Sequence, residues 1–526
     1  MKATMHTAEP AVHESQAPSR PNAAEVLRAI PRVDGIVPMY VDGRLRLATG
    51  GDARELIDPS TGEHVALVTE GDGTDVEQAI AAARRAFDDG PWPRMTATER
   101  AAVLFRVSDA IDAARDELAS IDTLNGGKPL RETAIDIADA ADCFRYYAGL
   151  TNKPHGQTFD VPGPTATFTI RQPIGVCGQI VPWNYPLLMA VWKLAPALAA
   201  ANVCVLKPAE TTPLSAIRLA TILESAGVPA GVVNIVPGAG PVVGAAIASS
   251  PLVDKIAFTG GTHTARRILA AAGPNLTKVS LELGGKSPNV VFADADFETA
   301  IDYALFGIFA NAGQICSAGS RLVLERRGHE RFLERLVERA KRIRVGDGFD
   351  PRTEMGPLVS QIQRERVERY VEIGSAEGAR LLCGGERLGG ALAPGNYISP
   401  AIFDRTTPEM RVVREEIFGP VLVVQTFETE DEALRIANET EYGLAAAVFT
   451  QDVAKAHRMV RGFRAGITWI NTYHPTYNEA PWGGTKRSGF GSELGTYGYD
   501  AYTELKQINV NLDVKPSGWF SDTAER

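Results

Sequence analysis

One cysteine stands in a turn of small residues in FANAGQICSAGSR, residues 309–321. Small residues let the backbone approach a ligand closely, and they leave the amide of Cys316 free to donate a hydrogen bond. A thiol in such a turn can act as a nucleophile, although a free cysteine is more often a small core residue. Cys316 taken alone leaves both interpretations open.

A carboxylate follows an apolar strand in SLELGGKSP, residues 280–288. Glu282 stands just before the Gly284-Gly285 pair, and burial there would raise the pKa of its carboxyl. A raised pKa suits a general base that works near neutral pH. The alternative is an ordinary surface glutamate at the end of a strand.

An amide side chain stands in a turn bounded by prolines in IVPWNYPLL, residues 180–188. Asn184 lies between Trp183 and Tyr185, and a rigid turn would hold its amide as a fixed donor to a developing oxyanion. Asparagine is also common in turns that have no catalytic role. Together with a nucleophile and a base, however, this donor completes the minimum set for covalent catalysis.

Residues suited to a dinucleotide follow two further strands. In VLKPAETTP, residues 205–213, Lys207 and Glu210 come at the carboxyl end of a strand, where α/β sheets bind nucleotides. A glutamate there can accept both hydroxyls of a ribose and would repel a 2′-phosphate, which predicts NAD over NADP. The glycine-rich turns at 237–244 and 258–266 suit a pyrophosphate, although neither is a G-x-G-x-x-G motif.

A second pair of residues suits the nicotinamide end of the same cofactor. REEIFGPV, residues 414–421, contributes Glu416 and Phe418. A ribose needs a hydroxyl acceptor, and the nicotinamide ring needs a flat apolar face.

The elements that must position these residues alternate between strand and helix, which is typical of a doubly wound parallel sheet. Helices are also predicted at 75–87, 96–114 and 132–148, after a hairpin around Asp42-Gly43. In the alternating region the predicted strands are 176–182, 202–208, 231–237 and 253–260, and the predicted helices are 187–201, 215–226 and 242–249.

A second α/β block runs from about residue 284 to 489 and includes strands at 288–293 and 322–325 and a helix at 329–344. The alternating stretches 165–171 and 504–514 predict two strands that could pair with each other, within the chain or across subunits. We therefore divide the chain into a loose N-terminal tail (1–34), a nucleotide-binding domain (35–153 and 174–284), a catalytic domain (285–489), and an oligomerisation arm with the C-terminal tail (154–173 and 490–526).

Length and charge limit the class of protein. A chain of 526 residues is expected to form two or three domains. The net charge of −10, with 54 basic and 64 acidic side chains, argues against a nucleic-acid partner. The apolar stretch 187–206 contains Lys193, Pro196 and Asn202, so a buried helix and strand are expected there and not a membrane span.

Cysteine usage points to a reducing compartment. None of the cysteines forms a C-x-x-C pair or a metal-ligand spacing, and the first residues contain no apolar run of a secretion signal, so we expect no bound metal and a cytoplasmic enzyme. The five cysteines are Cys143, Cys177, Cys204, Cys316 and Cys383.

Over residues 36–510 the chain resembles the aldehyde dehydrogenase family, because several motifs occur in the family's order. The spacing of 34 residues between Glu282 and Cys316 is also that of the family. The motifs are PWN at 182–184, KPAE at 207–210, FTG at 258–260, ELGGK at 282–286, GQICSAGSR at 313–321, EEIFGP at 415–420, and PWGG with KRSGFG between 481 and 491.

The resemblance implies a mechanism and a fold. Cys316 would attack the aldehyde, Asn184 and the Cys316 amide would hold the oxyanion, and Glu282 would activate water to hydrolyse a thioester. The implied fold is α/β, with a variant Rossmann-type NAD-binding domain, an α/β catalytic domain and a small β oligomerisation arm, in homodimers or homotetramers. The cofactor residues it implies are Ile180, Pro182, Trp183, Lys207, Glu210, Gly240, Gly244, Phe258, Thr259, Gly260, Gly261, Leu283, Gly284, Glu416 and Phe418.

Within the family the chain most resembles the betaine aldehyde and aminoaldehyde dehydrogenases, in which an aromatic cage receives a cationic end. Tyr185, Trp192 and Trp482 match the cage positions, and such rings attract a desolvated quaternary ammonium by about 2 kcal/mol. Two departures are Gly261, where many members have serine, and Ala265, where many have glycine. We also assign Ile467, Tyr477 and Glu479 to the substrate pocket, with Ile467 crowding it and Glu479 favouring a cation.

Two other readings of the whole protein stay open at this point. A relative that transfers the acyl group to coenzyme A commonly lacks the base at the position of Glu282, which is present here. A non-catalytic relative should have lost Cys316, Asn184 or Glu282, and all three are present. The preferred aldehyde is expected to be betaine aldehyde, with 4-aminobutanal or 3-aminopropanal as the alternative.

Overall fold

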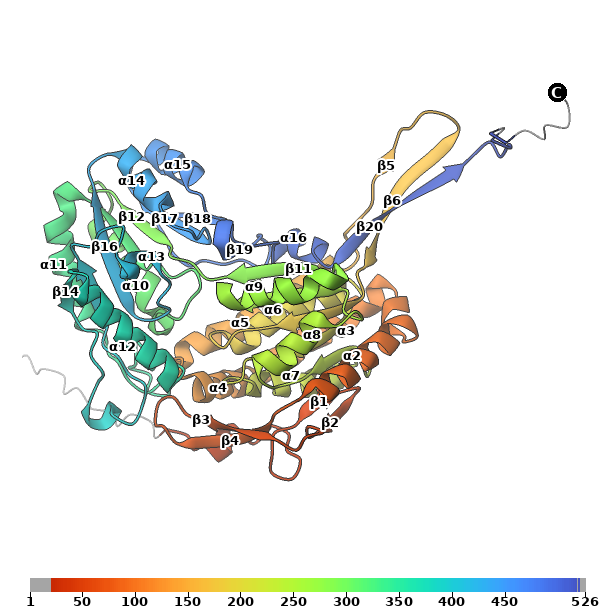
Figure 1. The fold of residues 1–526 in the computed structure, drawn as a ribbon, viewed down its shortest axis with the longest axis horizontal. Helices are drawn as coiled ribbons and strands as arrows, with labels where there is room; N and C mark the ends of the chain where they lie inside the picture. The colour runs from red at the N-terminus through yellow and green to blue at the C-terminus, as the bar shows by residue number, and fades with distance from the viewer. Residues whose placement is uncertain (1–19, 518, 521–526) are drawn as a thin grey trace, which may run out of the picture.

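Two large β-sheets and a projecting arm organise the chain (Figure 1). The computed structural model describes residues 20–517 and 519–520. An eight-stranded and a seven-stranded sheet, each flanked by helices, make up the body of the molecule, and a three-stranded sheet extends away from it. This arrangement is mixed α/β, as the sequence predicted.

The eight-stranded sheet has a parallel centre formed by β11, β10, β7, β8 and β9. Chain order reverses between β7 and β10, so a crevice is expected at the carboxyl ends of these two strands. In spatial order the strands are β19 (Gly489–Phe490), β11 (Lys278–Leu283), β10 (Lys255–Gly260), β7 (Val176–Ile180), β8 (Val203–Lys207), β9 (Val233–Ile235), β1 (Met39–Val41) and β2 (Arg44–Arg46).

Helices cover both faces of this sheet. Right-handed crossovers from β7 through β9 place α6 and α7 on one face, and the crossover from β10 to β11, which runs the other way along the sheet, places α9 on the opposite face. The helices around it are α2 (Gly73–Asp88), α3 (Ala97–Ala113), α4 (Arg115–Gly126), α5 (Leu130–Leu150), α6 (Pro186–Ala199), α7 (Leu214–Ser225), α8 (Ala245–Ser249) and α9 (Thr262–Ala272).

The apolar stretch 187–206 forms α6 and then β8, and every residue of both elements is buried. The predicted helix at 242–249 begins instead with a π-helical turn, Gly240–Gly244, and only then continues as α8. Among the described residues, no helix combines the length and the apolar character needed to cross a membrane.

The seven-stranded sheet carries the segment with Cys316, which follows α10 and precedes β13. The predicted helix at 329–344 ends earlier, at Ala340. In spatial order its strands are β14 (Arg380–Cys383), β15 (Ala401–Asp404), β16 (Val421–Phe427), β13 (Arg321–Glu325), β12 (Pro288–Val291), β17 (Ala445–Phe449) and β18 (Ile467–Ile470), and its helices are α10 (Phe297–Phe309), α11 (His329–Ala340), α12 (Gln361–Ala376), α13 (Arg411–Arg414), α14 (Glu430–Asn438) and α15 (Val453–Gly462).

The arm is an antiparallel sheet of β20 (Thr503–Asn511), β6 (Thr165–Pro173) and β5 (Thr158–Phe159) (Figure 1). The predicted pairing of its two long strands is made within one chain, from Thr503 opposite Pro173 to Asn511 opposite Thr165. A separate hairpin, β3 (Ala53–Ile57) with β4 (His64–Thr69), lies near the start of the chain.

The prediction of a loose tail over residues 1–34 is wrong for residues 20–34. A short helix, α1 (Ala23–Val26), begins with a capping box between Asn22 and Glu25 and packs against α4. Leu27 and Ile30 are 3% and 4% exposed, so apolar burial orders this segment although its composition suggests a tail. Residues 1–19 lie outside the described residues.

The segment after residue 489 differs from its predicted place in the arm. β19 joins the edge of the eight-stranded sheet beside β11, and α16 (Gly495–Asp500) packs against α6. Only from Thr503 onward does the chain enter the arm. The division into three domains otherwise stays a prediction, and residues 521–526 of the predicted C-terminal tail lie outside the described residues.

Candidate active site

A cavity of about 420 Å³ lies where the carboxyl ends of β10 and β11 meet the loop after α10. Its lining includes Cys316, Glu282 and Thr259. The candidate nucleophile and the candidate base, 34 residues apart in the sequence, therefore face one space. This is also the edge of the sheet where the strand order reverses.

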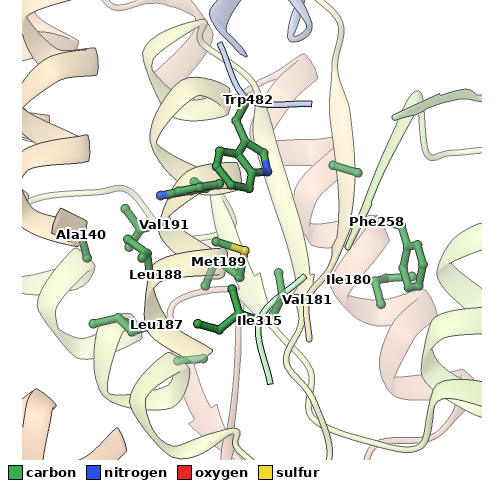
Figure 2. Packing of buried hydrophobic residues seen from close by; sticks show 14 of the residues in the cluster. Ala140, Ile180, Val181, Leu187, Leu188, Met189, Val191, Phe258, Ile315 and Trp482 are labelled. Carbon is green, nitrogen blue, oxygen red and sulfur yellow. The ribbon is translucent and has the colours of Figure 1, made fainter. Parts of the chain in front are cut away.

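The turn before Cys316 has an unusual backbone. Asn311, Ala312 and Gly313 have φ values of +46°, +52° and +73°. Glycine is required at position 313, because a side-chain carbon there would lie 2.2 Å from the carbonyl oxygen of Gly419. Figure 2 shows Ile315, the neighbour of Cys316, lying among Val181 and the side chains of α6.

Cys316 is half-buried, and its thiol is a weak acid here. Burial, followed by the negative charges of Glu282 and Glu416, raises the pKa of the Cys316 thiol to about 12. The thiol must therefore lose its proton to a base as it attacks. The glycine turn after β11 lies close, since a side-chain carbon at Gly285 would come within 3.0 Å of the Cys316 carbonyl oxygen.

Glu282 ends β11 as a buried carboxyl, 5% exposed. Burial and then the neighbouring Glu493 raise the pKa of Glu282 well above its ordinary value, while Lys193 lowers it. Neither of its carboxyl oxygens has a hydrogen-bond partner among the described residues. A desolvated carboxyl with free oxygens, facing a cavity, is suited to take a proton from water.

Two residues of this site, Lys193 and Glu493, are absent from the sequence-based set. Lys193, fully buried in α6, donates to Thr259 Oγ1 at 2.6 Å and to the carboxylate of Glu493. Glu493 also lines the cavity. Lys193 and Glu493 thus form a buried charge pair next to Glu282. The one sequence signal that could have indicated this pair is a lysine inside an apolar helix.

Asn184 is 8% exposed, and its amide is fixed by the loop that carries Cys316. Its Nδ2 donates to the carbonyl oxygen of Gln314 at 2.8 Å, two residues before Cys316. The Asn184 carbonyl oxygen in turn accepts from Asn311 Nδ2 at 3.2 Å. One of the two Nδ2 hydrogens is thus used to orient the amide, and the other stays available to an oxyanion.

The predicted ribose ligands are side by side at the end of β8. Lys207 Nζ lies 3.4 Å from Glu210 Oε1, and the same oxygen accepts from the Gly240 amide at 2.5 Å. Lys207 is buried and Glu210 is partly exposed. Gly244 lies beside Lys207 and Ile180, each 3.7–3.8 Å from where its side-chain carbon would be. The cluster combines a hydroxyl acceptor, a cation and glycine turns, which fits an adenosine ribose and its phosphates.

The predicted nicotinamide ligands also lie together, beside the glycine turn after β11. Glu416 accepts from the Gly285 amide at 3.1 Å, and burial raises the pKa of the Glu416 carboxyl to about 7. A side-chain carbon at Gly284 would lie 1.9 Å from Glu416 Oε1, so a larger residue there would displace the Glu416 carboxyl. Phe418, at φ +62°, packs edge-on against Trp183 with ring centroids 5.2 Å apart.

The remaining predicted cofactor residues are found at the same sheet edge. Gly261 caps α9 without a side-chain bond, which leaves its first amides available to an anion. Thr259 and Leu283 line the cavity itself. The remaining cofactor residues stand in the last positions of β7, β10 and β11 or just after these strands. They are Ile180, Pro182, Trp183, Phe258, Thr259, Gly260, Gly261 and Leu283.

Six residues were predicted to form the substrate pocket; three of them line the cavity and three do not. Tyr185, Trp192 and Trp482 line the cavity, and the two indoles pack edge-on with centroids 5.7 Å apart. Ile467, Tyr477 and Glu479 are not in its lining; Tyr477 is 62% exposed, and Ile467 begins β18. These three residues were assigned from the resemblance to the family, and their place in the substrate pocket stays a prediction.

An acidic wall of the cavity was not predicted from the sequence. Glu132, Asp136 and Asp139 of α5 all line it, with Lys128 as the only basic side chain in the lining. Lys128 pairs with Asp136 at 2.5 Å, and its Nζ lies 3.4 Å from the centre of the Tyr185 ring. Glu132 and Asp139 have no lysine partner among the described residues, and burial raises the pKa of Glu132 to about 7 and that of Asp139 to about 6.

A buried imidazole completes the lining. Burial lowers the pKa of His474 to about 4, so the ring is neutral. His474 Nδ1 lies 3.3 Å from Ser317 Oγ, next to the candidate nucleophile, while Nε2 has no partner among the described residues. A neutral ring leaves the negative character of the cavity intact.

The cavity places a cysteine and a buried carboxyl beside the edge of a sheet where nucleotides bind. This arrangement is that of an enzyme that forms a covalent adduct with its substrate. The sequence matches the profile of the aldehyde dehydrogenase family over residues 47–508. It is 48% identical over 485 residues to the betaine aldehyde dehydrogenase of Bacillus subtilis, covering 92% of this chain and 99% of that protein. It is 46% identical to human retinal dehydrogenase 2, covering 91% and 92%.

A solved structure agrees. The betaine aldehyde dehydrogenase of Staphylococcus aureus in complex with NAD⁺ superposes with a TM-score of 0.93 at 42% identity, covering 95% of this chain and 98% of that one. The chain belongs to the aldehyde dehydrogenase family and has its fold. The sequence-based predictions of family, fold and enzyme class are confirmed.

Proposed function

We propose that this enzyme oxidises an aldehyde to its carboxylic acid with NAD, through a thiohemiacetal and a thioester on Cys316. The observation that carries the proposal is the shared cavity of Cys316 and Glu282 at the nucleotide edge of the sheet. The balanced reaction consumes aldehyde, NAD⁺ and water and yields the carboxylate, NADH and two protons.

The residues divide the reaction between them. The Cys316 thiol gives its proton to solvent water as its sulfur bonds to the aldehyde carbon, and the oxyanion that forms is held by Asn184 Nδ2 and the Cys316 amide. When bound, NAD accepts the hydride that leaves this carbon, so a thioester results. Glu282 then takes a proton from water, the hydroxide attacks the thioester, and the thiol is released.

NAD is supported over NADP by the charge at the ribose cluster. Glu210 offers an oxygen held by Gly240 and Lys207, which can accept ribose hydroxyls. A 2′-phosphate at this position would meet the Glu210 carboxylate, and like charges repel at such short range. The Staphylococcus aureus relative, solved with NAD⁺, is consistent with this choice.

A cationic aldehyde is the substrate class that the cavity favours. Similarity alone does not decide, because a betaine aldehyde dehydrogenase and a retinal dehydrogenase match this chain at 48% and 46% identity. The lining supplies three carboxyls of α5 against one lysine, and two indoles that can attract a desolvated cation. We place betaine aldehyde first.

An aminoaldehyde is the second candidate, supported by a specific feature. A primary ammonium carries N–H donors, and the carboxylates of α5 can accept them. A trimethylammonium has no such donor. The face of Tyr185 toward Lys128 is already occupied by the lysine cation, which reduces the predicted three-ring cage to Trp192 and Trp482.

The substrate is tested by kcat/KM for betaine aldehyde, 3-aminopropanal and 4-aminobutanal against hexanal and benzaldehyde, followed through NADH. We expect the cations to exceed the neutral aldehydes by about 10-fold or more, as a buried charge interaction would give. Asp139→Asn should reduce kcat/KM for the preferred cation more than for hexanal. A clear preference for hexanal or benzaldehyde in the wild-type enzyme would rule out the cationic substrate.

Self-association and location complete the proposal. We propose a homodimer or homotetramer, because the arm exposes apolar side chains such as Leu505, which is 62% exposed. The described structure contains five free cysteines and no disulfide among its residues, which supports a reducing compartment and hence the cytoplasm.

A further inference from the structure

The turn that presents Cys316 is built from backbone that L residues disfavour. Asn311 and Ala312 both adopt the left-handed region, followed by Gly313 in the same region. Two consecutive non-glycine residues with such φ values persist only where surrounding contacts hold them. The contacts that hold this turn therefore decide where the thiol five residues after Asn311 is placed.

Most of these contacts come from residues close to the turn. Asn311 Nδ2 donates to the carbonyl oxygens of Asn184 and Gln314, each at 3.2 Å, and Gln314 Nε2 donates back to the Asn311 carbonyl at 3.1 Å. Ile315 packs among Val181 and residues of α6 (Figure 2). These contacts hold the turn from the side of the nucleotide-binding sheet.

A further contact reaches the turn from α5. The backbone amide of Asn311 donates to Glu132 Oε2 at 3.0 Å, across 179 residues of sequence. Glu132 lies in the first turn of α5, yet it forms no cap of that helix. It makes no salt bridge with any described residue, so the bond to Asn311 is the one polar use of this carboxyl in residues 20–517 and 519–520.

The Glu132 carboxyl also borders two cavities. Glu132 lines both the substrate cavity and a second cavity of about 680 Å³, and Ile135, Phe306 and Ala310 are shared by the same two linings. Ala310 immediately precedes the strained turn. Glu132 is thus the point where α5, the cavity wall and the turn of Cys316 meet.

We propose that Glu132 is a positioning residue, whose carboxylate holds the Asn311 turn so that Cys316 presents its thiol to the aldehyde. The inference rests on the proposed role of Cys316 as nucleophile. It concerns the acceptor oxygen at position 132, and not its charge. Reaction geometry is sensitive to displacements of about 1 Å, which can reduce a rate about 100-fold.

The test compares Glu132→Ala with Glu132→Gln in the full-length enzyme. A glutamine keeps an acceptor oxygen for the Asn311 amide, whereas alanine removes it. With hexanal, a neutral aldehyde, we expect alanine to lower kcat by about 10- to 100-fold with little change in KM, and glutamine to stay within about 3-fold of wild type. Alkylation of Cys316 by iodoacetamide should slow in the alanine variant and not in the glutamine variant.

A matched control is Asp142→Asn, which removes a carboxylate from the exposed face of the same helix, where it pairs only with Arg145. It should leave both rates unchanged. Should Glu132→Ala fail to fold, as judged by its thermal melt, Glu132→Met replaces it as a side chain of similar length without an acceptor.

The outcomes separate this inference from the function on which it rests. Wild-type kcat and alkylation in the folded alanine or methionine variant would overturn the positioning role. An equal loss in the glutamine variant would do so too, because it would show that charge and not the bond matters. Activity retained in Cys316→Ser would instead overturn the proposed function itself.

Discussion

Charge around Glu282 is arranged at the scale of single residues. Glu282, Glu493 and Lys193 share a buried space, and Lys193 donates to Glu493 while leaving both Glu282 oxygens unpartnered. Burial and Glu493 raise the pKa of Glu282, whereas Lys193 opposes this. The neighbours of Glu282 therefore set the pH at which this base becomes active.

This arrangement predicts the pH dependence of thioester hydrolysis. Glu282 acts only when deprotonated, so the hydrolysis rate should fall as pH drops below its raised pKa. Glu493→Gln removes a negative neighbour and lowers that pKa, which should move the acid limb of the pH–rate profile to lower pH. Lys193→Met removes the opposing cation and should move it to higher pH.

The measurement is single-turnover hydrolysis of the acyl-enzyme between about pH 5 and 9, the range where a raised carboxyl pKa titrates. Asp142→Asn, which changes a distant surface carboxylate, serves as the control. If the acid limb of the pH–rate profile lies at the wild-type pH in both variants, Glu282 is not the titrating base.

Site residues could be predicted from the sequence where they stand in a recognisable motif. They could not be predicted where folding brings together residues that are far apart in the sequence. Cys316, Glu282 and Asn184 stand in local patterns whose chemistry can be read directly. Lys193 and Glu493 lie 300 residues apart, and only the packing of α6 against the segment after β19 makes them a pair. Ile467, Tyr477 and Glu479 were expected in the substrate pocket from the resemblance to the family, and the cavity lining does not include them.

At the scale of elements, the arm is the part whose shape implies a partner. β6 and β20 pair over their full length and project from the body (Figure 1). By their register, Ile170 and Val510 lie on one face of this sheet, and they are 39% and 42% exposed. A projecting sheet with apolar side chains in water is expected to be covered by another copy of the chain.

Placing charge on this face should weaken association. Ile170→Lys with Val510→Lys would bring two cations into an apolar interface, so the 56.4 kDa chain should shift toward the monomer. The check is mass measured by light scattering during gel filtration. Leu276→Lys, which changes an 89% exposed leucine away from the arm, is the control. An unchanged mass in the double variant would exclude this face from the interface.

Most elements could be predicted because their patterns are strong. Short apolar segments between glycine and proline turns predicted the strands of the parallel sheet. Alternation of apolar and polar residues predicted the two long strands of the arm. The segment 20–34 could not be predicted, since contacts with distant parts of the chain, among them α4 and Asp58, order it. Nor could the role of residues 489–502, where a two-residue strand, β19, adds to the sheet edge beside Glu282.

At the scale of the whole molecule, the two large sheets position different catalytic residues. The eight-stranded sheet carries Glu282, Asn184 and the ribose cluster, while the segment before β13 of the other sheet carries Cys316. The cavity forms where the two meet, so catalysis depends on their relative placement. The acidic wall of α5 lies at the same junction and gives it the charge that a cationic aldehyde requires.

The central claim is that the aldehyde becomes a thioester on Cys316 which Glu282 then hydrolyses. It is tested most directly by mixing Glu282→Gln with NAD and betaine aldehyde and following NADH and intact mass. We expect a rapid burst of about one NADH per chain, as a trapped acyl-enzyme would give, and then near arrest. The acyl mass should lie on the peptide that contains Cys316, and Cys316→Ala should show no burst while still binding NAD. Steady turnover without a burst, or an acyl group on another residue, would contradict the account.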